Sequence, residues 1–297
     1  MLAFSSLLGN VEGQNIYRIW YDKPASYWEE ALPVGNGRIA AMVFGDPQLE
    51  QIQLNEETVS AGSPYQNYNE EAKTALPEMR RLIFEGKYEE AQNMAATKIL
   101  SQVGNEMPYQ TVGRLNIRYQ DHKKVNNYYR DLDISNAVAV TRYEVDGVEF
   151  TEETFASFTD QLVIRHIKAS KPGTINCELF FNTPMRDPKR SIYGKKGLRL
   201  EGITHGSRYF PGKVHYCADL DVKHKGGKVI TANDTLLSVQ GASELTLYIS
   251  MATNFVNYKD ISGDPYQRNK AYLKNAAKDY SKRKPLILLL IRNNSIV

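Results

Sequence analysis

Hydrophobic positions along the chain follow two different periods, and the changes between them divide the sequence. From Ile16 to about Asn55, short apolar runs alternate with turn residues, as is typical of strands. From Glu70 to Ser101, apolar positions recur at helical spacing. From Leu115 to Ala252, the pattern is again almost entirely that of short strands. The sequence therefore predicts a β domain that carries an inserted helical hairpin.

The inserted segment is predicted to contain two helices separated at Gly86. Pro77 is expected to open the longer part of the first helix, because the first helical position needs no N–H donor. The apolar positions at helical spacing are Ala72, Leu76, Met79, Leu82 and Ile83 before the glycine, and Tyr88, Ala91, Ala95 and Ile99 after it.

The strand-rich part of the chain predicts a mainly β fold. The clearest β-hairpin surrounds Asp146-Gly147, which supplies the positive φ angles of a two-residue turn. Many short runs separated by tight turns indicate a large antiparallel two-sheet β-sandwich, which we assign to residues 16–262. The strand-like runs include NIYRIWY, RIAAMVFG, EQIQLN, QLVIRHIKA, INCELFF, VHYCADLDV, TLLSVQ and ELTLYISMA.

Residues 263–297 are predicted to start a helical linker and to end in an aberrant apolar tail. Asp264 can cap a helix whose first position is Pro265. Pro285 is expected to end the helical pattern. The apolar run that follows, Leu286–Ile291, is too short to span a bilayer, and we expect no membrane span in the chain.

The charge balance argues against a nucleic-acid partner. The 297 residues include 37 basic and 34 acidic side chains, for a net charge of +3. No stripe of Lys and Arg with interleaved aromatic residues is present to follow a phosphate backbone. The 19 Tyr and 2 Trp residues are compatible with contacts to sugar rings, although most aromatic residues pack in cores.

Cysteine and histidine spacing gives no sign of a metal site. Cys177 and Cys217 each lie in a strand-like run, and we favour two buried free thiols over a disulfide between them. The five histidines show no HxH, HxxxH or HExxH spacing. Neither a metal nor another cofactor is expected.

The N-terminal residues 1–15 support two interpretations equally. An apolar run from Leu2 to Leu8 resembles a signal peptide that lacks its basic start, with cleavage plausible near Gln14. The alternative is a disordered terminus. The first interpretation predicts a secreted or periplasmic protein.

The stretch Gly35–Ala40 matches the dinucleotide fingerprint G-x-G-x-x-G/A, with Glu56 at about the right distance. That fingerprint requires a strand before the glycines and a helix after them. Here EALP precedes the glycines and a strand-like run follows them. We therefore interpret Asn36-Gly37 as a tight turn between strands, in which both residues supply positive φ angles.

The acidic clusters do not predict a catalytic carboxylate pair. Glu56-Glu57 and Glu152-Glu153 are sequence neighbours, which point to opposite faces of a strand. Asp219 and Asp221 share a face, but we expect it to be an ordinary solvated one. No nucleophile elbow is present either.

Several segments in order resemble the N-terminal domain of glycoside hydrolase family 95, the inverting α-L-fucosidases. The resemblance extends from about Ile16 to near Tyr280. It implies a β-sandwich that leads through a helical linker into an (α/α)6 barrel, which carries the catalytic residues in that family. No catalytic residue can be assigned to this chain. The matching segments are IWYDKPASYWEEALPVGNGRIAAMVFG, EQIQLNEETVSAGSP, LPEMRRLIFEGKYEEAQ, YQTVGRLNIRY and YYRDLDISNAVAVTRYEVDGVEFTEETFAS.

The chain departs from the family pattern in three places. Ser60 replaces a usual Trp, and Thr151–Phe155 lacks a usual Arg. The tail SKRKPLILLLIRNNSIV resembles nothing in the family. We hypothesise a gene fragment or a shifted reading frame.

The resemblance implies a domain that supports a barrel and is inactive alone. A stand-alone carbohydrate-binding module that uses Trp20, Trp28 or some of the tyrosines on an aromatic face is the alternative. In the first case a fucosylated glycan is bound through the full-length enzyme, and the barrel-facing surface is exposed and prone to self-association. The predicted substrate-rim or domain-interface residues are the polar members of two matched motifs, Asn36, Arg38, Asn55 and Glu56. The competing interpretation is that Asn36 serves its turn and Asn55 and Glu56 satisfy backbone groups.

Overall fold

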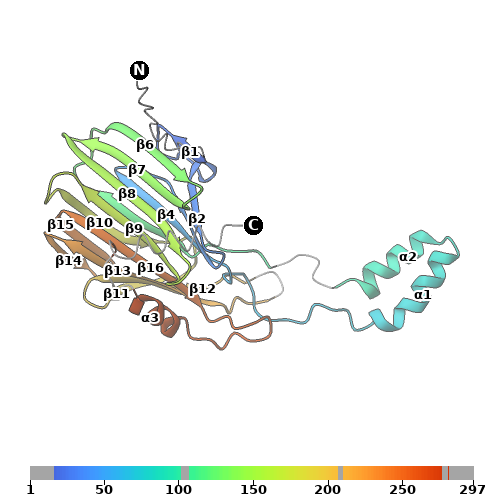
Figure 1. Ribbon diagram of the computed structural model, residues 1–297. Helices are drawn as coiled ribbons and strands as arrows, with labels where there is room; N and C mark the ends of the chain where they lie inside the picture. Colours follow the sequence, from blue (N-terminus) through green and yellow to red (C-terminus); the bar gives the residue numbers. More distant parts are fainter. Residues whose placement is uncertain (1–16, 102–106, 207–209, 276–279, 281–297) are drawn as a thin grey trace, which may run out of the picture.

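The computed structural model describes residues 17–101, 107–206, 210–275 and 280. Two antiparallel sheets face each other, which confirms the predicted β-sandwich (Figure 1). The nine-stranded sheet has the order β1 (Arg18–Tyr21), β6 (Asn126–Asp133), β7 (Val138–Val145), β8 (Val148–Ser157), β9 (Leu162–Ala169), β16 (Glu244–Thr253), β13 (His215–Lys225), β12 (Gly197–Ile203) and β11 (Lys189–Tyr193). The seven-stranded sheet has the order β14 (Lys228–Asn233), β15 (Leu236–Ala242), β10 (Ile175–Asn182), β5 (Gly113–Tyr119), β4 (Leu49–Glu56), β3 (Ile39–Val43) and β2 (Leu32–Gly35).

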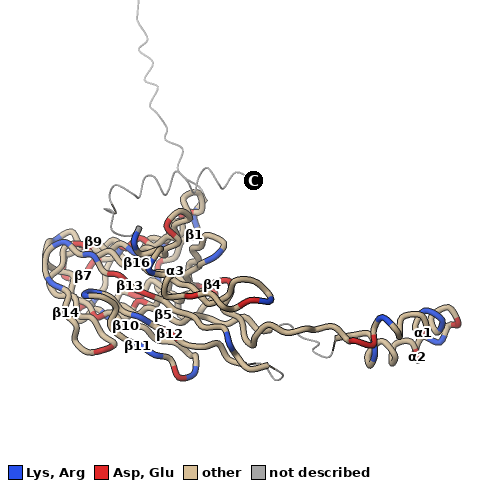
Figure 2. Tube along the Cα trace, turned by 90° about the horizontal axis from the view of Figure 1, so that it is seen from below, with Lys and Arg blue, Asp and Glu red and all other residues tan. Residues whose placement is uncertain are grey.

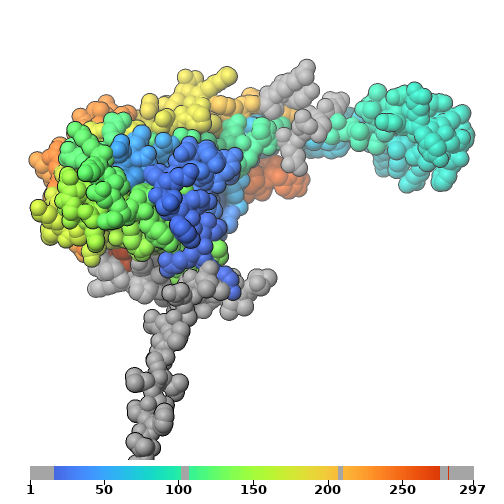
Figure 3. Space-filling view, turned by 90° about the horizontal axis from the view of Figure 1, so that it is seen from above, coloured from blue at the N-terminus to red at the C-terminus, as the bar shows by residue number. Residues whose placement is uncertain are grey.

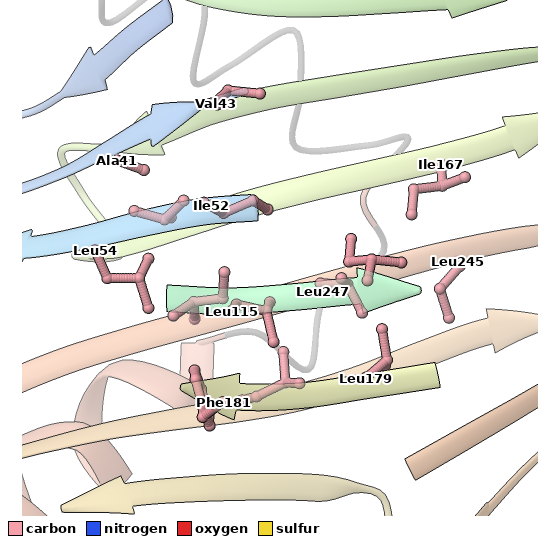
Figure 4. Close-up of a cluster of buried hydrophobic side chains, with 14 of the residues drawn as sticks. Ala41, Val43, Ile52, Leu54, Leu115, Ile167, Leu179, Phe181, Leu245 and Leu247 are labelled. Carbon is pink, nitrogen blue, oxygen red and sulfur yellow. The ribbon is translucent and has the colours of Figure 1, made fainter. Parts of the chain in front are cut away.

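The main core lies between the two sheets. Every second residue of β4 is buried, so that Ile52 and Leu54 point inward while their neighbours point outward. They belong to one apolar cluster with Leu179 of the same sheet and with Ile167 and Leu247 of the opposite sheet (Figure 4). This alternation is the physical origin of the period seen in the sequence.

The predicted turn at Asp146-Gly147 is present, but one strand was not predicted as such. Asp146 and Gly147 have φ angles of 51° and 74° and join β7 to β8, as predicted. Strand β2, which contains Pro33, is absent from the predicted strand-like runs, although Asn36-Gly37 was predicted to join two strands. The strand pairs with β3 alone and forms the edge of its sheet, where a proline is tolerated.

The predicted helical hairpin is present and projects from one end of the sandwich (Figure 1). It consists of α1 (Ala72–Phe84), α2 (Tyr88–Met94) and the π-helical turn η2 (Ala95–Ile99), and Gly86 adopts a φ of +75° between the helices. Our expectation for Pro77 was wrong, because α1 begins at Ala72 and contains Pro77 in its interior. A short 3-10 helix, η1 (Trp28–Glu30), follows β1.

Helix α3 (Pro265–Asn275) packs against β13 and β16 on the outer face of the nine-stranded sheet. Asp264 caps it as predicted, because its Oδ1 accepts hydrogen bonds from the backbone N–H groups of Tyr266 (2.8 Å) and Gln267 (3.1 Å). Leu273 joins a second, smaller apolar cluster on this face. The predicted signal-peptide remnant (1–15) and the apolar tail (281–297) lie outside the described residues.

The helix-covered face explains one wrong expectation about the acidic residues. Asp219 is fully buried instead of solvated, since Arg199 on β12 donates to it from Nε (2.6 Å) and Nη2 (2.8 Å). Cys217 on the same strand and Cys177 on β10 are buried free thiols, as favoured from the sequence. Burial raises the pKa of both thiols, which keeps them protonated.

A fully buried ionic cluster joins the two sheets inside the core. Arg165 on β9 donates from Nη2 to Glu50 on β4, 2.7 Å away across the sandwich, and it also pairs with Glu152 on β8. Arg165 Nη1 donates to Thr154 at 2.8 Å. Glu152 accepts further hydrogen bonds from the hydroxyls of Tyr119 (2.5 Å) and Tyr143 (2.8 Å). Two carboxylates therefore share one guanidinium in an environment without solvent.

Replacement of Arg165 tests the importance of this cluster. We expect Arg165→Met to lower the free energy of unfolding by about 3–5 kcal/mol, because two buried carboxylates lose their counter-charge. Arg118→Met is the matched control, since Arg118 forms an exposed pair with Glu178 and its loss costs less than about 1 kcal/mol. Urea denaturation gives both values, and similar costs for the two variants would contradict the prediction.

Glu50 makes stability depend on pH. Burial raises its pKa from 4.5 to about 7, so its contribution to stability is complete below pH 4.5 and is lost as the pH rises through 7. Glu50→Gln does not titrate. The free energy of unfolding of the wild type relative to this variant should fall by about 3 kcal/mol between pH 4.5 and 8, measured by urea denaturation. Parallel curves for the two proteins would show that Glu50 ionises normally.

Candidate functional site: a polar cluster at one end of the sandwich

The turn between β2 and β3 positions the first two predicted site residues. Asn36 Oδ1 accepts hydrogen bonds from the backbone N–H groups of Arg38 (3.1 Å) and Ile39 (2.9 Å). Its Nδ2 donates to the carbonyl of Ser157 at 2.9 Å. Gly37 has a φ of +92°, whereas Asn36 is absent from the positive-φ residues, so our expectation of two such residues was half right. Asn36 acts through its side-chain hydrogen bonds.

The same turn excludes a dinucleotide site of the kind that the glycines suggest. Strand β3 follows the turn and runs antiparallel to β2. A fingerprint glycine loop would lead into a helix whose N-terminus holds the pyrophosphate. The glycines of this segment therefore connect two strands, as predicted.

Arg38 is the centre of the cluster. Its Nη1 donates to Glu56 Oε1 (3.2 Å) and to the carbonyl of Met251 (2.9 Å), and its Nε donates to Gln161 Oε1 (2.6 Å). The guanidinium carbon lies 4.8 Å from the ring centroid of Tyr272 on α3. Arg38 thus links the β2–β3 turn to β4, β16 and the helix.

Glu56 is buried at the end of β4 and its carboxylate is fully engaged. Oε1 receives Arg38, while Oε2 accepts from the backbone N–H (2.8 Å) and hydroxyl (2.6 Å) of Thr58. Burial is the largest influence and raises the pKa of Glu56, although Thr58 and Arg38 oppose it. Thr58 also contacts the hydroxyl of Thr253 on β16. Through these bonds Glu56 connects β4 with the β2–β3 turn, and its carboxylate has little access to a substrate.

Asn55 does not join the other three residues. It lies on the outer face of β4, half-buried, because alternate residues of that strand point to opposite sides. The pair Glu152-Glu153 separates in the same way, with Glu152 in the core and Glu153 accepting a 2.7 Å hydrogen bond from Tyr280 outside it.

Residues that complete the cluster were not found from the sequence. Thr58 carries a local signal, since a hydroxyl two residues after a buried carboxylate commonly bonds it. Gln161 and Tyr272 carry none, because they are separated from Arg38 by more than 100 positions. Their contact with Arg38 depends on the tertiary fold.

The surface carries two grooves, of which one borders the cluster at Thr58. An apolar groove of about 700 Å³ is lined by residues that include Thr58, Met107 and Phe255. A more polar groove of about 610 Å³ is lined by residues that include Glu201, His215 and Tyr266. Trp20 and Trp28, the residues proposed for glycan stacking, are 61% and 50% exposed and line neither groove.

The described part of the chain gives no support for a metal or membrane role. Among the described residues, no three His, Cys, Asp or Glu side chains gather closely enough to hold a metal ion. In the same part, no helix combines the length and apolar character needed to cross a bilayer. Basic and acidic residues are interspersed over the chain trace (Figure 2).

Two asparagines from the predicted set allow a matched test of structural roles. Asn36→Ala should lower the free energy of unfolding by about 1–3 kcal/mol, because it removes the two turn bonds and one of the hydrogen bonds to the Ser157 carbonyl, which keeps the backbone N–H of Gln161. Asn55→Ala should change it by less than about 0.5 kcal/mol. Thermal and urea unfolding provide the comparison, and an equal effect of the two substitutions would refute the assignment.

Comparison with known proteins identifies what this fold is similar to. Residues 19–258 match the family described as "Glycosyl hydrolase family 65, N-terminal domain". The chain is 31% identical over 271 residues to "Alpha-L-fucosidase 2" of Arabidopsis thaliana, and 26% identical over 253 residues to "Probable alpha-fucosidase A" of Aspergillus niger. The alignments cover 82% and 80% of this chain, but 31% and 30% of those proteins.

A solved structure supports the fold independently of sequence. The "Putative kojibiose phosphorylase from human microbiome" superimposes with a TM-score of 0.51 at 9% identity, over 93% of this chain and 37% of that one. The chain therefore spans about a third of the length of the relatives it matches. The fucosidase relatives confirm the resemblance to the α-L-fucosidase-like N-terminal domains of glycoside hydrolase family 95. The match over residues 19–258 shows that the chain belongs to the family described as "Glycosyl hydrolase family 65, N-terminal domain".

Proposed function

We propose that the chain is the N-terminal β-sandwich portion of an inverting α-L-fucosidase-like glycoside hydrolase, and that it supports an (α/α)6 barrel and is inactive alone. The two α-fucosidase relatives favour a fucosylated glycan as the substrate of the complete enzyme. A secreted or periplasmic location belongs to the same proposal and rests on the apolar run from Leu2 to Leu8, which resembles a signal peptide without its basic start.

The proposal rests on the ion pairs and hydrogen bonds that already occupy three buried carboxylates. Inverting hydrolysis needs one carboxyl group to protonate the leaving oxygen and another to activate water on the opposite side of the sugar. Glu50 and Glu152 are sealed in the core around Arg165, and Glu56 is held by Arg38 and Thr58. None of these three is positioned to contact a glycosidic bond.

The remaining polar contacts fit a structural role. Arg268 of α3 donates from Nη1 to the carbonyls of Thr253 (2.9 Å) and Phe255 (2.6 Å), and Asn269 donates from Nδ2 to the carbonyl of Cys217 (3.0 Å). The helix is thereby attached to two strands of the sheet. In an enzyme of the proposed kind, a fixed helix provides a rigid connection between the sandwich and the barrel.

The purified chain should release no fucose from a fucosyl-α1,2-galactoside. A full-length α-fucosidase relative assayed in parallel is the positive control, and chromatographic detection of free fucose is the measurement. Turnover at rates typical of an enzyme, on the order of 1 s⁻¹ or above, would overturn the proposal. Calorimetric titration of the same preparation with a fucosylated oligosaccharide tests the alternative. Heat of binding that disappears in Trp20→Ala would favour a carbohydrate-binding module.

A further inference from the structure

We propose that the α1–α2–η2 hairpin and the apolar groove at its base form one docking surface, whose occupant is the globular portion that the longer relatives carry beyond the region matched here. The inference rests on the proposed function, because it names the surface through which the sandwich holds that portion. It is argued from packing, from the distribution of apolar and charged side chains, and from the length of the relatives.

The hairpin lacks the internal packing needed to stabilise its helices. Helices α1 and α2 pack mainly on each other and on η2, and they bury only Ala75, Leu82 and Ala91. Helices of 13 and 7 residues are marginal in water without tertiary contacts. Figure 3 shows the hairpin, in teal, standing clear of the sandwich. A partner is required to supply the missing contacts.

One side of the hairpin is apolar and uncovered. Leu76 and Ile83 are seven residues apart and therefore lie on the same side of α1, with 38% and 39% of their surface exposed. Phe84 and Tyr88 follow at the helix connection and are 88% and 68% exposed. Arg80, four residues after Leu76 and three before Ile83, is exposed on the same side of the helix. Large exposed apolar side chains beside an arginine fit a protein interaction site.

The opposite side of α1 is charged. Arg81 pairs with Glu78 and Glu85 at 2.5 Å, and all three side chains are exposed. Their spacing places them across the helix from Leu76 and Ile83. The helix is thus amphipathic: Ala75 and Leu82 are buried within the hairpin, whereas Leu76 and Ile83 remain exposed.

The apolar groove continues this surface at the base of the hairpin. Its lining includes Tyr65 and Met107 from the two segments that carry the hairpin, together with Phe255, Tyr258 and Ile261 from the loop after β16. Tyr258 is 75% exposed. Aromatic residues and methionine, here three aromatic rings and Met107, are enriched at the centre of protein–protein interfaces.

The size of the relatives identifies the occupant. The matched region makes up 31% and 30% of the two α-fucosidases, so most of each relative lies outside it. The family match runs from residue 19 to residue 258 and so includes the hairpin and most of the groove lining. A hairpin that projects from one end of the sandwich leaves room for that portion against this end (Figure 1).

Hydrogen exchange on a fusion protein tests the inference. The full chain is fused ahead of the portion of the Arabidopsis thaliana relative that lies beyond the matched region, and is compared with the chain alone. We expect amides of α1 and α2 to exchange at least about ten-fold more slowly in the fusion. Phe84→Ser combined with Tyr88→Ser should abolish this protection. Arg81→Gln, on the charged side, is the control and should retain it.

Fucosidase activity of the unmodified fusion reports separately on the proposed function. An active fusion whose hairpin exchanges as fast as in the isolated chain overturns the docking surface and leaves the proposed function intact. An inactive fusion with a protected hairpin supports docking and counts against the proposed function, while loss of both refutes both. If the isolated chain is a dimer by light scattering with its hairpin protected, the occupant is a second copy and the inference is wrong.

Discussion

The buried guanidinium of Arg165 is the interaction on which the sandwich depends. It is the charge through which β9 of one sheet binds Glu50 on β4 of the other, while also neutralising Glu152 beside it. Glu50 in turn accepts the backbone N–H groups of Phe44 (3.2 Å) and Gly45 (2.9 Å), where the chain leaves β3. Apolar packing tolerates small shifts of one sheet over the other, but an ionic cluster without water does not, so these bonds define how the sheets are aligned.

The polar cluster around Arg38 connects elements in the same way at the end of the sandwich. It connects the β2–β3 turn with β4, with β16 and with α3 through contacts that no single element could make alone. The first of the five segments that resemble the family thus has a structural purpose in this domain. The residues that resemble the hydrolase family in this segment serve to connect strands of the sandwich.

Sequence patterns predicted what is decided locally and failed where distant residues meet. The Asp146-Gly147 turn, the Asp264 cap and the alternation of β4 follow from neighbours in the chain, and each was predicted. The burial of Asp219 was not, because it depends on Arg199 of the adjacent strand and on the packing of α3. Among the candidate site residues, Asn55 and Glu56 were predicted together, but alternate residues of β4 point to opposite faces and the structure separates them. The contact of Arg38 with Gln161 required the fold.

The position at which the hairpin leaves the sandwich has an evolutionary consequence. The excursion begins after β4 and returns at β5, and these strands are hydrogen-bonded neighbours, with Leu54 opposite Gly113. Its two ends are therefore held together whatever lies between them. Because loop-closure entropy grows only logarithmically, doubling such an excursion costs about 0.6 kcal/mol. Insertions and deletions in this segment can therefore change the surface that contacts a partner, while the strand order of the sheets stays the same.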